Sequence, residues 1–237
     1  MPERFYAPVS FDPPSVELSG PEARHLKDVL RLGVGREVML FDGRGMEARA
    51  EIASVGKRTV ALSILEVRAA ASDDRQPVIL ATAVPKGDRF RFLVEKATEL
   101  GVDVLVPLST ERSVVVPRDV KLDKMRHTVI AASKQCGRAR LMEVDRLRTW
   151  KEFLDEDCEG RRILIAHPSG RAASSGLPAL DGPSPTIAVI GPEGGLTRDE
   201  IDAAVAAGAD VVSLGSNILR VETAAIVLCT LLLLSDR

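Results

Sequence analysis

The chain has 237 residues, of which 45% are hydrophobic and 28% charged, and this balance predicts a soluble globular protein with one large domain or one domain and a small appendage. The formal net charge of −2 hides an asymmetry, because residues 73–150 carry a net charge of +4 and residues 151–237 one of −6. The three cysteines are widely spaced and form no metal-ligand cluster with the three histidines, so we expect a reduced, cytoplasmic protein without a metal site.

Residues 1–72 have the pattern of a small β-rich domain with one helix. Ser19-Gly20-Pro21 is a helix-start signal, and we expect this helix to run to about Arg31 before the glycines at 33 and 35. Half-buried antiparallel strands are predicted where apolar and polar residues alternate, at 37–42, 46–53 and 57–67. Asp42 to Gly45 has the composition of a hairpin connection. A small β-barrel is therefore expected, followed by a linker at 69–76.

From Pro77 onward, predicted strands alternate with predicted helices. A continuous apolar run typical of a buried parallel strand lies at 78–84, and further strands are expected at 102–107, 163–166, 186–190 and 210–213. Helices are expected at 90–100, 120–136, 150–157, 197–207 and 221–235, with Thr197 and Glu200 forming a capping box. Residues 73–237 are therefore predicted to form a doubly wound α/β domain.

The last predicted helix contains the strongly apolar run Ala224 to Leu234. This run has eleven residues, whereas a helix that spans a bilayer needs about 20. The N-terminus has no apolar stretch of the signal-peptide type. We expect no membrane association and interpret the run as a buried helix or a subunit contact.

Basic side chains concentrate between Arg118 and Arg148, where nine lysines and arginines stand against four carboxylates. Such a patch attracts nucleic-acid phosphates in a salt-dependent way. A solvated helix face would have the same composition, so charge alone leaves both interpretations open. Aromatic residues make up 3% of the chain, which argues against base stacking as the main contact with RNA.

Two glycine loops near the C-terminus are the most informative feature of the sequence. Residues 190–197 read Ile-Gly-Pro-Glu-Gly-Gly-Leu-Thr, and the second loop begins at Ser213, each directly after a predicted parallel strand. Ligands of open α/β sheets bind at the carboxyl ends of such strands. Neither loop has the P-loop or dinucleotide pattern, so a nucleotide-like ligand without a triphosphate fits better. Glycines that only form tight turns remain the alternative.

The two loops together resemble the ribosomal small subunit methyltransferase E family, through Gly-Pro-Glu-Gly-Gly-Leu-Thr followed by Leu-Gly-x-x-Ile-Leu-Arg-x-Glu-Thr-Ala. The resemblance covers nearly the whole chain. Further motifs match the family in the same order, namely His25-Leu26 with Val29 to Arg31, Pro85 to Arg89, Glu95 to Val102, Thr110 to Ser113 and Gln135 to Arg138.

This resemblance implies a fold and an activity. The fold is α/β, with an N-terminal PUA-like RNA-binding β-barrel over residues 1–72 and a SPOUT-type methyltransferase domain over 73–237. It also implies a C-terminal trefoil knot, in which the chain after Gly191 threads beneath an earlier loop. The implied reaction is methylation of N3 of a uridine in 16S rRNA, with S-adenosylmethionine as cofactor. The implied partners are 16S rRNA or the assembled small ribosomal subunit and a second copy of the chain in a homodimer.

Three loops are expected to hold the methyl donor, after the strand that ends at Ala166 and in the two glycine loops. Backbone groups there can read the adenine edge while leucine and isoleucine side chains pack on its faces. The predicted cofactor-binding residues are Ala166, His167, Ile190, Gly191, Glu193, Gly195, Leu214, Gly215, Ile218 and Leu219.

Arg220 and Glu222 are the predicted catalytic residues. The Arg220 guanidinium can hold a phosphate or a uracil carbonyl and stabilise the charge that develops when N3 loses its proton. A salt bridge to Glu222 or Glu193 is its structural alternative. Glu222 can act as general base or orient Arg220, and it can also simply complement the helix dipole.

Seven basic residues are candidates for RNA contact. Three share one helix face by their spacing, and four lie at strand or helix ends of the second domain, with ordinary surface cations as the alternative. They are Arg24, Lys27 and Arg31, and Lys86, Arg89, Arg112 and Arg138. Two other functions stay open, a SPOUT-like methyltransferase that acts on tRNA or another RNA and a non-catalytic RNA-binding protein.

Overall fold

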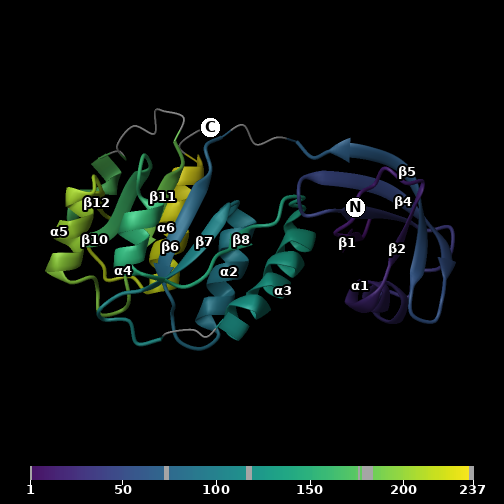
Figure 1. Ribbon diagram of the computed structural model, residues 1–237, viewed down its shortest axis with the longest axis horizontal. Helices are drawn as coiled ribbons and strands as arrows, with labels where there is room; N and C mark the ends of the chain where they lie inside the picture. Colours follow the sequence, from purple (N-terminus) through teal and green to yellow (C-terminus); the bar gives the residue numbers. More distant parts are fainter. Residues whose placement is uncertain (1, 72–74, 116–118, 176, 178–183, 235–237) are drawn as a thin grey trace. The chain divides into compact units, whose positions relative to one another are not determined.

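The computed structural model describes residues 2–71, 75–115, 119–175, 177 and 184–234, and the chain divides into two compact units. Residues 1–73 and 133–141 form the first unit, and residues 74–132 and 142–237 form the second. Each unit has its own β-sheet (Figure 1). Within the described ranges, no helix has both the length and the apolar character that a membrane crossing requires.

The first unit contains a five-stranded half-barrel sheet in the order β1-β3-β4-β5-β2. The parallel β1–β3 pair stands at one edge, and all other pairs are antiparallel. The strands are β1 (Arg4–Tyr6), β2 (Ser15–Leu18), β3 (Glu37–Phe41), β4 (Met46–Val55) and β5 (Val60–Ala69). The three strands predicted from alternation are confirmed. The other two, β1 and β2, have three and four residues, too few to give a readable alternation.

The β3–β4 hairpin forms at the predicted connection because Asp42 satisfies its backbone. Asp42 Oδ1 accepts hydrogen bonds from the backbone N–H groups of Arg44 at 2.7 Å and of Gly45 and Met46 at 3.0 Å each. Gly43 and Gly45 adopt positive φ angles of 82° and 112°, which glycine accepts without steric cost.

The predicted first helix is shorter and less regular than its spacing indicated. It consists of α1 (Gly20–Arg24) and a π-helical turn η1 (His25–Val29). Arg31 lies beyond it with a positive φ of 54°. Core packing explains the change, because Leu26 is fully buried and Leu30 and Leu32 pack against the same hydrophobic cluster. The prediction that Arg31 shares a helix face with Arg24 and Lys27 is therefore wrong.

Residues 133–141 belong to the first unit, although the residues on both sides of them belong to the second, and no feature of the sequence indicated this. Lys134 Nζ forms an ion pair with Glu22 Oε2 at 2.9 Å, and its ammonium lies 5.0 Å from the centre of the Phe5 ring. The backbone N–H of Leu141 donates to the carbonyl oxygen of Gly43 at 3.0 Å. Lys134 and Glu22 lie 112 positions apart in the sequence, so local patterns could not predict their contact.

The second unit contains a seven-stranded sheet whose described pairs are all parallel. The strand order is β12-β10-β11-β6-β7-β8, and β9 also pairs with β7. The strands are β6 (Val78–Ala83), β7 (Val104–Ser109), β8 (Glu143–Val144), β9 (Arg148–Thr149), β10 (Arg162–Ala172), β11 (Thr186–Ile190) and β12 (Asp210–Ser213). The predicted strands at 186–190 and 210–213 are confirmed at both ends.

Helices cover both faces of this sheet, as the doubly wound pattern predicted. On one face α6 packs against β6, β11 and α2. On the other, Trp150, Phe153 and Ala204 share a core cluster with Ile79 and Ile187. The helical segments are α2 (Arg89–Leu100), α3 (Asp119–Cys136), α4 (Trp150–Glu152), η2 (Phe153–Asp157), η3 (Ala173–Ser175), α5 (Arg198–Ala206) and α6 (Val221–Leu234).

β10 is longer than predicted and contains an excursion. Both Ala166 and Arg171 pair with Val212 on β12, so residues 167–170 leave the ladder between them. A Cβ on Gly170 would lie 2.6 Å from backbone atoms of Val212, closer than any side chain tolerates. The prediction of a strand end at 166 is therefore wrong, because pairing with a distant strand resumes after the excursion. Part of the predicted loop at 170–185 lies outside the described residues.

Candidate active site

Loops from four neighbouring parallel strands meet at one edge of the second sheet. The neighbours are β12, β10, β11 and β6, and all run in the same direction. The three predicted donor-binding segments follow or interrupt the first three of these strands. Carboxyl ends of parallel strands lie at the same edge, so the structure brings these segments together as the sequence predicted.

The first glycine loop depends on glycine at two positions. The backbone N–H of Gly195 donates to Pro192 O at 2.8 Å, and Gly195 has a φ of 71°. A Cβ on Gly191 would approach Leu196 Cγ to 2.9 Å. Ile190 and Leu196 are buried on either side of the turn. The loop is thus a tightly packed backbone turn directly after β11.

Two contacts fasten this loop to the turn that follows β7. Arg112 Nη1 donates to the carbonyl oxygen of Gly194 at 3.0 Å. Glu200 Oε1 accepts from the backbone N–H of Glu111 at 2.8 Å, while its Oε2 accepts from Thr197 N at 2.8 Å. The predicted capping box of Thr197 and Glu200 is confirmed. The second role of Glu200 was not predicted, since a backbone contact 89 residues away leaves no local signal.

Arg89 connects the first glycine loop with α6. Its Nη2 lies 3.1 Å from Glu193 Oε1, and its Nη1 lies 3.9 Å from Glu222 Oε2. Glu222 is 7% exposed, and its Oε2 has no hydrogen-bond partner among the described residues. A separation of 3.9 Å counts as an ion pair but is too long for a hydrogen bond. The site therefore contains a buried carboxylate oxygen with an open acceptor position.

Arg220 differs from Arg89 in its surroundings. It is exposed, it precedes α6, and its carbonyl oxygen accepts from Ala224 N at 2.8 Å. Over the described ranges its side chain forms no ion pair, so the alternative of a salt bridge to Glu193 or Glu222 does not hold. Arg89 pairs with both carboxylates instead.

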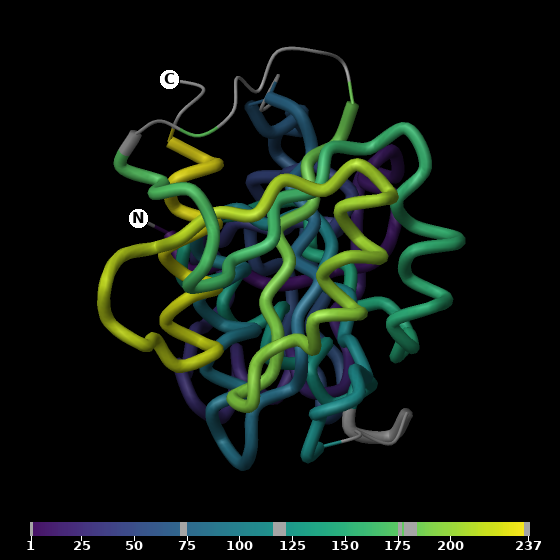
Figure 2. The backbone as a smooth tube through the Cα atoms, turned by 90° about the vertical axis from the view of Figure 1, so that its left-hand side faces the viewer, coloured from purple at the N-terminus to yellow at the C-terminus, as the bar shows by residue number. Residues whose placement is uncertain are grey.

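The second glycine loop, residues 214–220, forms a wide turn before α6 (Figure 2). Gly215 has a φ of 125°, and its carbonyl oxygen accepts a hydrogen bond from Ser213 Oγ at 3.3 Å. Leu214 and Leu219 are half-buried. Ile218 is 92% exposed, so its side chain is free to meet a ligand or another chain.

Ala166 and His167 stand at the start of the β10 excursion, and both are half-buried. His167 Nδ1 lies 2.8 Å from Ser169 Oγ within that excursion. This is a local contact between neighbours within the excursion. Among the described residues, no cluster of histidine, cysteine or acidic side chains is suited to hold a metal ion.

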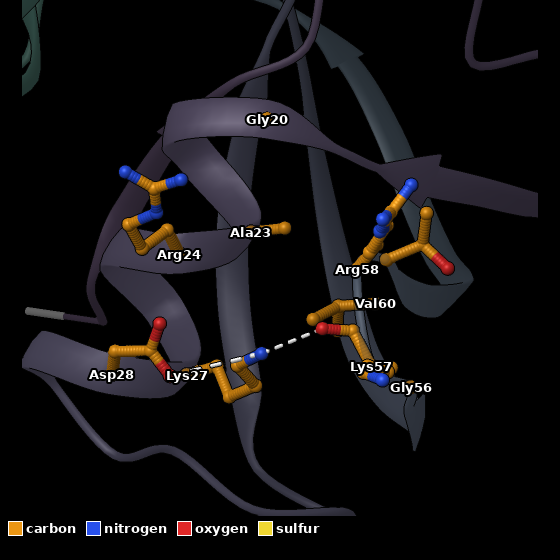
Figure 3. A pocket seen from close by; sticks show the side chains of 10 residues that line it. Gly20, Ala23, Arg24, Lys27, Asp28, Gly56, Lys57, Arg58 and Val60 are labelled. Atoms are coloured by element: carbon orange, nitrogen blue, oxygen red, sulfur yellow. Dashed lines mark hydrogen bonds and ion pairs between the residues drawn. The ribbon is translucent and has the colours of Figure 1, made fainter.

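The structure separates the predicted RNA contacts into two sets. Lys86, Arg89 and Arg112 belong to the second unit, where Lys86 is exposed and its carbonyl oxygen accepts from Arg89 Nε at 3.3 Å. Arg24, Lys27, Arg31 and Arg138 belong to the first unit. Lys57 and Arg58, which the sequence analysis did not select, line the same pocket as Arg24 and Lys27, and they do so from the opposite side (Figure 3). The sequence feature that could have identified Lys57 and Arg58 is the occurrence of two adjacent cations in a hairpin turn.

Family models match both parts of the chain. Residues 72–233 match an RNA methyltransferase domain, and residues 18–65 match an RNA methyltransferase PUA domain. The ribosomal RNA small subunit methyltransferase E of Bacillus subtilis is 30% identical over 221 residues, which are 89% of this chain and 86% of that protein. The protein of the same name from Synechocystis sp. is 35% identical over 222 residues, with coverages of 92% and 72%.

Solved structures give the same relationship. Ribosomal RNA small subunit methyltransferase E from Neisseria gonorrhoeae, bound to S-adenosyl methionine, is similar with a TM-score of 0.87 and 29% identity, over 97% of this chain and 95% of that one. A structure from Legionella pneumophila with bound SAM has a TM-score of 0.89 and 30% identity, with coverages of 100% and 98%. The chain therefore belongs to the ribosomal RNA small subunit methyltransferase E family.

Proposed function

We propose that this protein transfers a methyl group from S-adenosylmethionine to N3 of a uridine in 16S rRNA. Family membership over most of the chain supports the reaction class, and the two solved relatives were determined with the donor bound. The observation in this chain that carries the proposal is the buried, open acceptor of Glu222 beside Arg89 and the first glycine loop.

The residues at the sheet edge fit such a donor. The half-buried Leu214 and Leu219 offer apolar surface, the buried Ile190 packs beneath the first loop, and the absence of a side chain at Gly191 leaves the backbone there uncovered. A mostly apolar pocket with a few placed polar groups is the usual environment of an adenosine-like ligand. Ala166, His167, Glu193, Gly195, Gly215 and Ile218 complete the proposed walls. The donor supplies an electrophilic methyl group when it is bound there.

The chain's own residues supply orientation and proton removal. The Arg220 guanidinium faces solvent without a carboxylate partner in the described structure, so it is available to a uracil carbonyl or a phosphate. There it would stabilise the charge that develops on O2 or O4. We assign the role of general base to Glu222, because its open oxygen can accept the N3 proton. Its pairing with Arg89 rather than Arg220 argues against a role in orienting Arg220.

The RNA partner and the assembly state follow the same proposal. We propose 16S rRNA, free or in the small subunit, as the substrate and the cytoplasm as the compartment, in line with three cysteines that form no disulfide.

We also propose a homodimer, because Leu231 and Leu234 of α6 and Ile218 are exposed. Light scattering of the purified protein should give twice the chain mass. The trefoil knot after Gly191 stays a prediction from the family resemblance.

Transfer of a labelled methyl group tests the reaction directly. The purified protein should label small-subunit particles that lack the modification, with the label on N3 of one uridine of 16S rRNA. Label on tRNA instead would favour the alternative substrate. RNA binding without any transfer would favour a non-catalytic binding protein and contradict the proposal.

A further inference from the structure

A pocket of about 270 Å³ in the first unit lies between the helical segment α1–η1 and the β4–β5 turn. Figure 3 shows Lys27 reaching from the helical side toward the turn, with Arg58 on the opposite wall. Polar and charged side chains dominate its lining, together with glycine backbone. The residues that matter here are Gly20, Arg24, Lys27, Asp28, Lys57 and Arg58.

Two hydrogen bonds give this pocket a defined shape. The backbone N–H of Gly56 donates to Thr59 O at 2.9 Å and closes the hairpin, which places Lys57 and Arg58 at its tip. Lys27 Nζ donates to the carbonyl oxygen of Lys57 at 2.8 Å and ties the helical side to the turn. The backbone of the turn and the Lys27 side chain are therefore held in place before any ligand arrives, and less order has to be imposed on binding.

The charges around the pocket are unbalanced. The lining contains four cations and one carboxylate, Asp28, whose Oδ1 lies 3.7 Å from Lys27 Nζ. In the part of the chain that the structure describes, the side chains of Arg24, Lys57 and Arg58 form no ion pair or hydrogen bond. An anion placed between like charges relieves their repulsion and is attracted by all of them.

The arginines on the strands of the same unit behave differently. Arg4 and Arg68 both pair with Glu47, at 2.7 and 2.9 Å, and Arg49 pairs with Glu37 at 3.1 Å. Carboxylate partners are thus available in this unit and neutralise the strand arginines. Arg24, Lys57 and Arg58 have no such partner in the described structure, and they line a hollow that can admit a ligand.

We infer that this pocket binds phosphodiester groups of the rRNA backbone. The inference rests on the proposed function and adds a site to it. All its lining residues fall within residues 18–65, which match the RNA methyltransferase PUA domain. The lining contains no aromatic side chain, so base stacking is not the mode of binding. Contacts of cations with phosphates position an RNA without reading its sequence.

Salt dependence of RNA binding tests the inference. The variants are Arg24→Gln, Lys57→Gln and Arg58→Gln, and the matched control is Arg36→Gln, an exposed arginine of the same unit outside the pocket. Binding to a 16S rRNA transcript is measured from low to high salt. The logarithm of the observed binding constant falls linearly with the logarithm of the salt concentration. Each lost phosphate contact should make this slope less steep by about 0.7–0.9. The affinity for S-adenosylmethionine should not change, and circular dichroism should show intact folding.

Three results would contradict phosphate binding in this pocket while leaving the proposed methyltransferase activity in place. Either the three pocket variants keep the wild-type slope, or Arg36→Gln lowers the slope as much as they do, while the wild-type protein binds and methylates rRNA. If the pocket variants lost affinity for small-subunit proteins but kept the wild-type affinity for naked rRNA, the inference would also be contradicted. A wild-type protein that neither binds nor methylates rRNA would remove the proposed function and this inference together.

Discussion

Arg89 is the residue whose position says most about the candidate active site. Its guanidinium pairs with Glu193 of the first glycine loop and approaches Glu222 of α6, partners that lie more than a hundred residues further along the chain. Because a guanidinium presents a rigid fork of donors, it can serve two carboxylates at once. Arg220, which has no carboxylate partner among the described residues, remains available to substrate.

Arg220→Ala should lower kcat by about 10²–10³, since it removes a group that stabilises developing charge. Arg220→Lys should restore little of this rate, because an ammonium cannot present the same planar fork. Single-turnover methyl transfer measures the effect, and the exposed α5 residue Arg198 provides the control substitution Arg198→Ala. Equal rates for Arg220→Ala and the control would exclude a catalytic role.

Glu222→Gln keeps the shape of the side chain and removes its ability to accept a proton. We expect kcat to fall by about 10²–10⁴ and to recover partly as the pH rises, because hydroxide then removes the N3 proton. The pH profile of methyl transfer provides the measurement. A wild-type rate at neutral pH would mean that Glu222 only complements the dipole of α6.

The three cysteines should differ strongly in reactivity. Burial raises the pKa of both the Cys158 and the Cys229 thiol to about 12, whereas Cys136 is exposed. A raised pKa keeps the thiol protonated, and only the thiolate attacks thiol reagents. At pH 8 the folded protein should therefore be labelled at Cys136 alone, and the denatured protein at all three cysteines, as counted by mass spectrometry. Rapid labelling of Cys229 in the folded protein would contradict its burial within α6.

At the scale of the elements, prediction succeeded where burial is continuous and local. β6 and β11 were recognised because each is a short, fully buried and mostly apolar run after a turn signal. The excursion in β10 was missed because it depends on pairing with Val212, and the π-helical turn because it depends on where Leu30 and Leu32 meet the core. The sequence analysis selected Arg89 as an RNA contact from its place at the end of an element, and nothing near it in sequence points to its ion pairs with Glu193 and Glu222.

The anchor at the start of α5 gives a stability prediction. Glu200→Ala removes the acceptor of two backbone N–H groups, those of Glu111 and Thr197, and should cost about 1–3 kcal/mol of unfolding free energy. The neighbouring exposed Asp199 lies in the same first turn, so Asp199→Ala should cost less than about 1 kcal/mol. Urea unfolding followed by the single tryptophan, Trp150 of the second unit, compares them. Equal losses would show that Glu200 acts through the helix dipole alone.

At the scale of the whole molecule, the two units divide the work that RNA methylation requires. The first unit presents unpaired cations around a shaped pocket, and the second brings glycine loops, a buried carboxylate and a free guanidinium to one sheet edge. In our proposal, separate parts of the chain supply binding through the backbone of RNA and chemistry at one base. Substitutions in the pocket should change affinity for RNA, and substitutions at the sheet edge should change the rate of transfer.

Mass mapping of modified uridines in 16S rRNA tests the central claim most directly. It compares cells that contain this protein, cells that lack it, and cells that carry Glu222→Gln. One N3-methylated uridine should be present in the first and absent from the other two. An identical set of 16S rRNA modifications in all three would contradict the account.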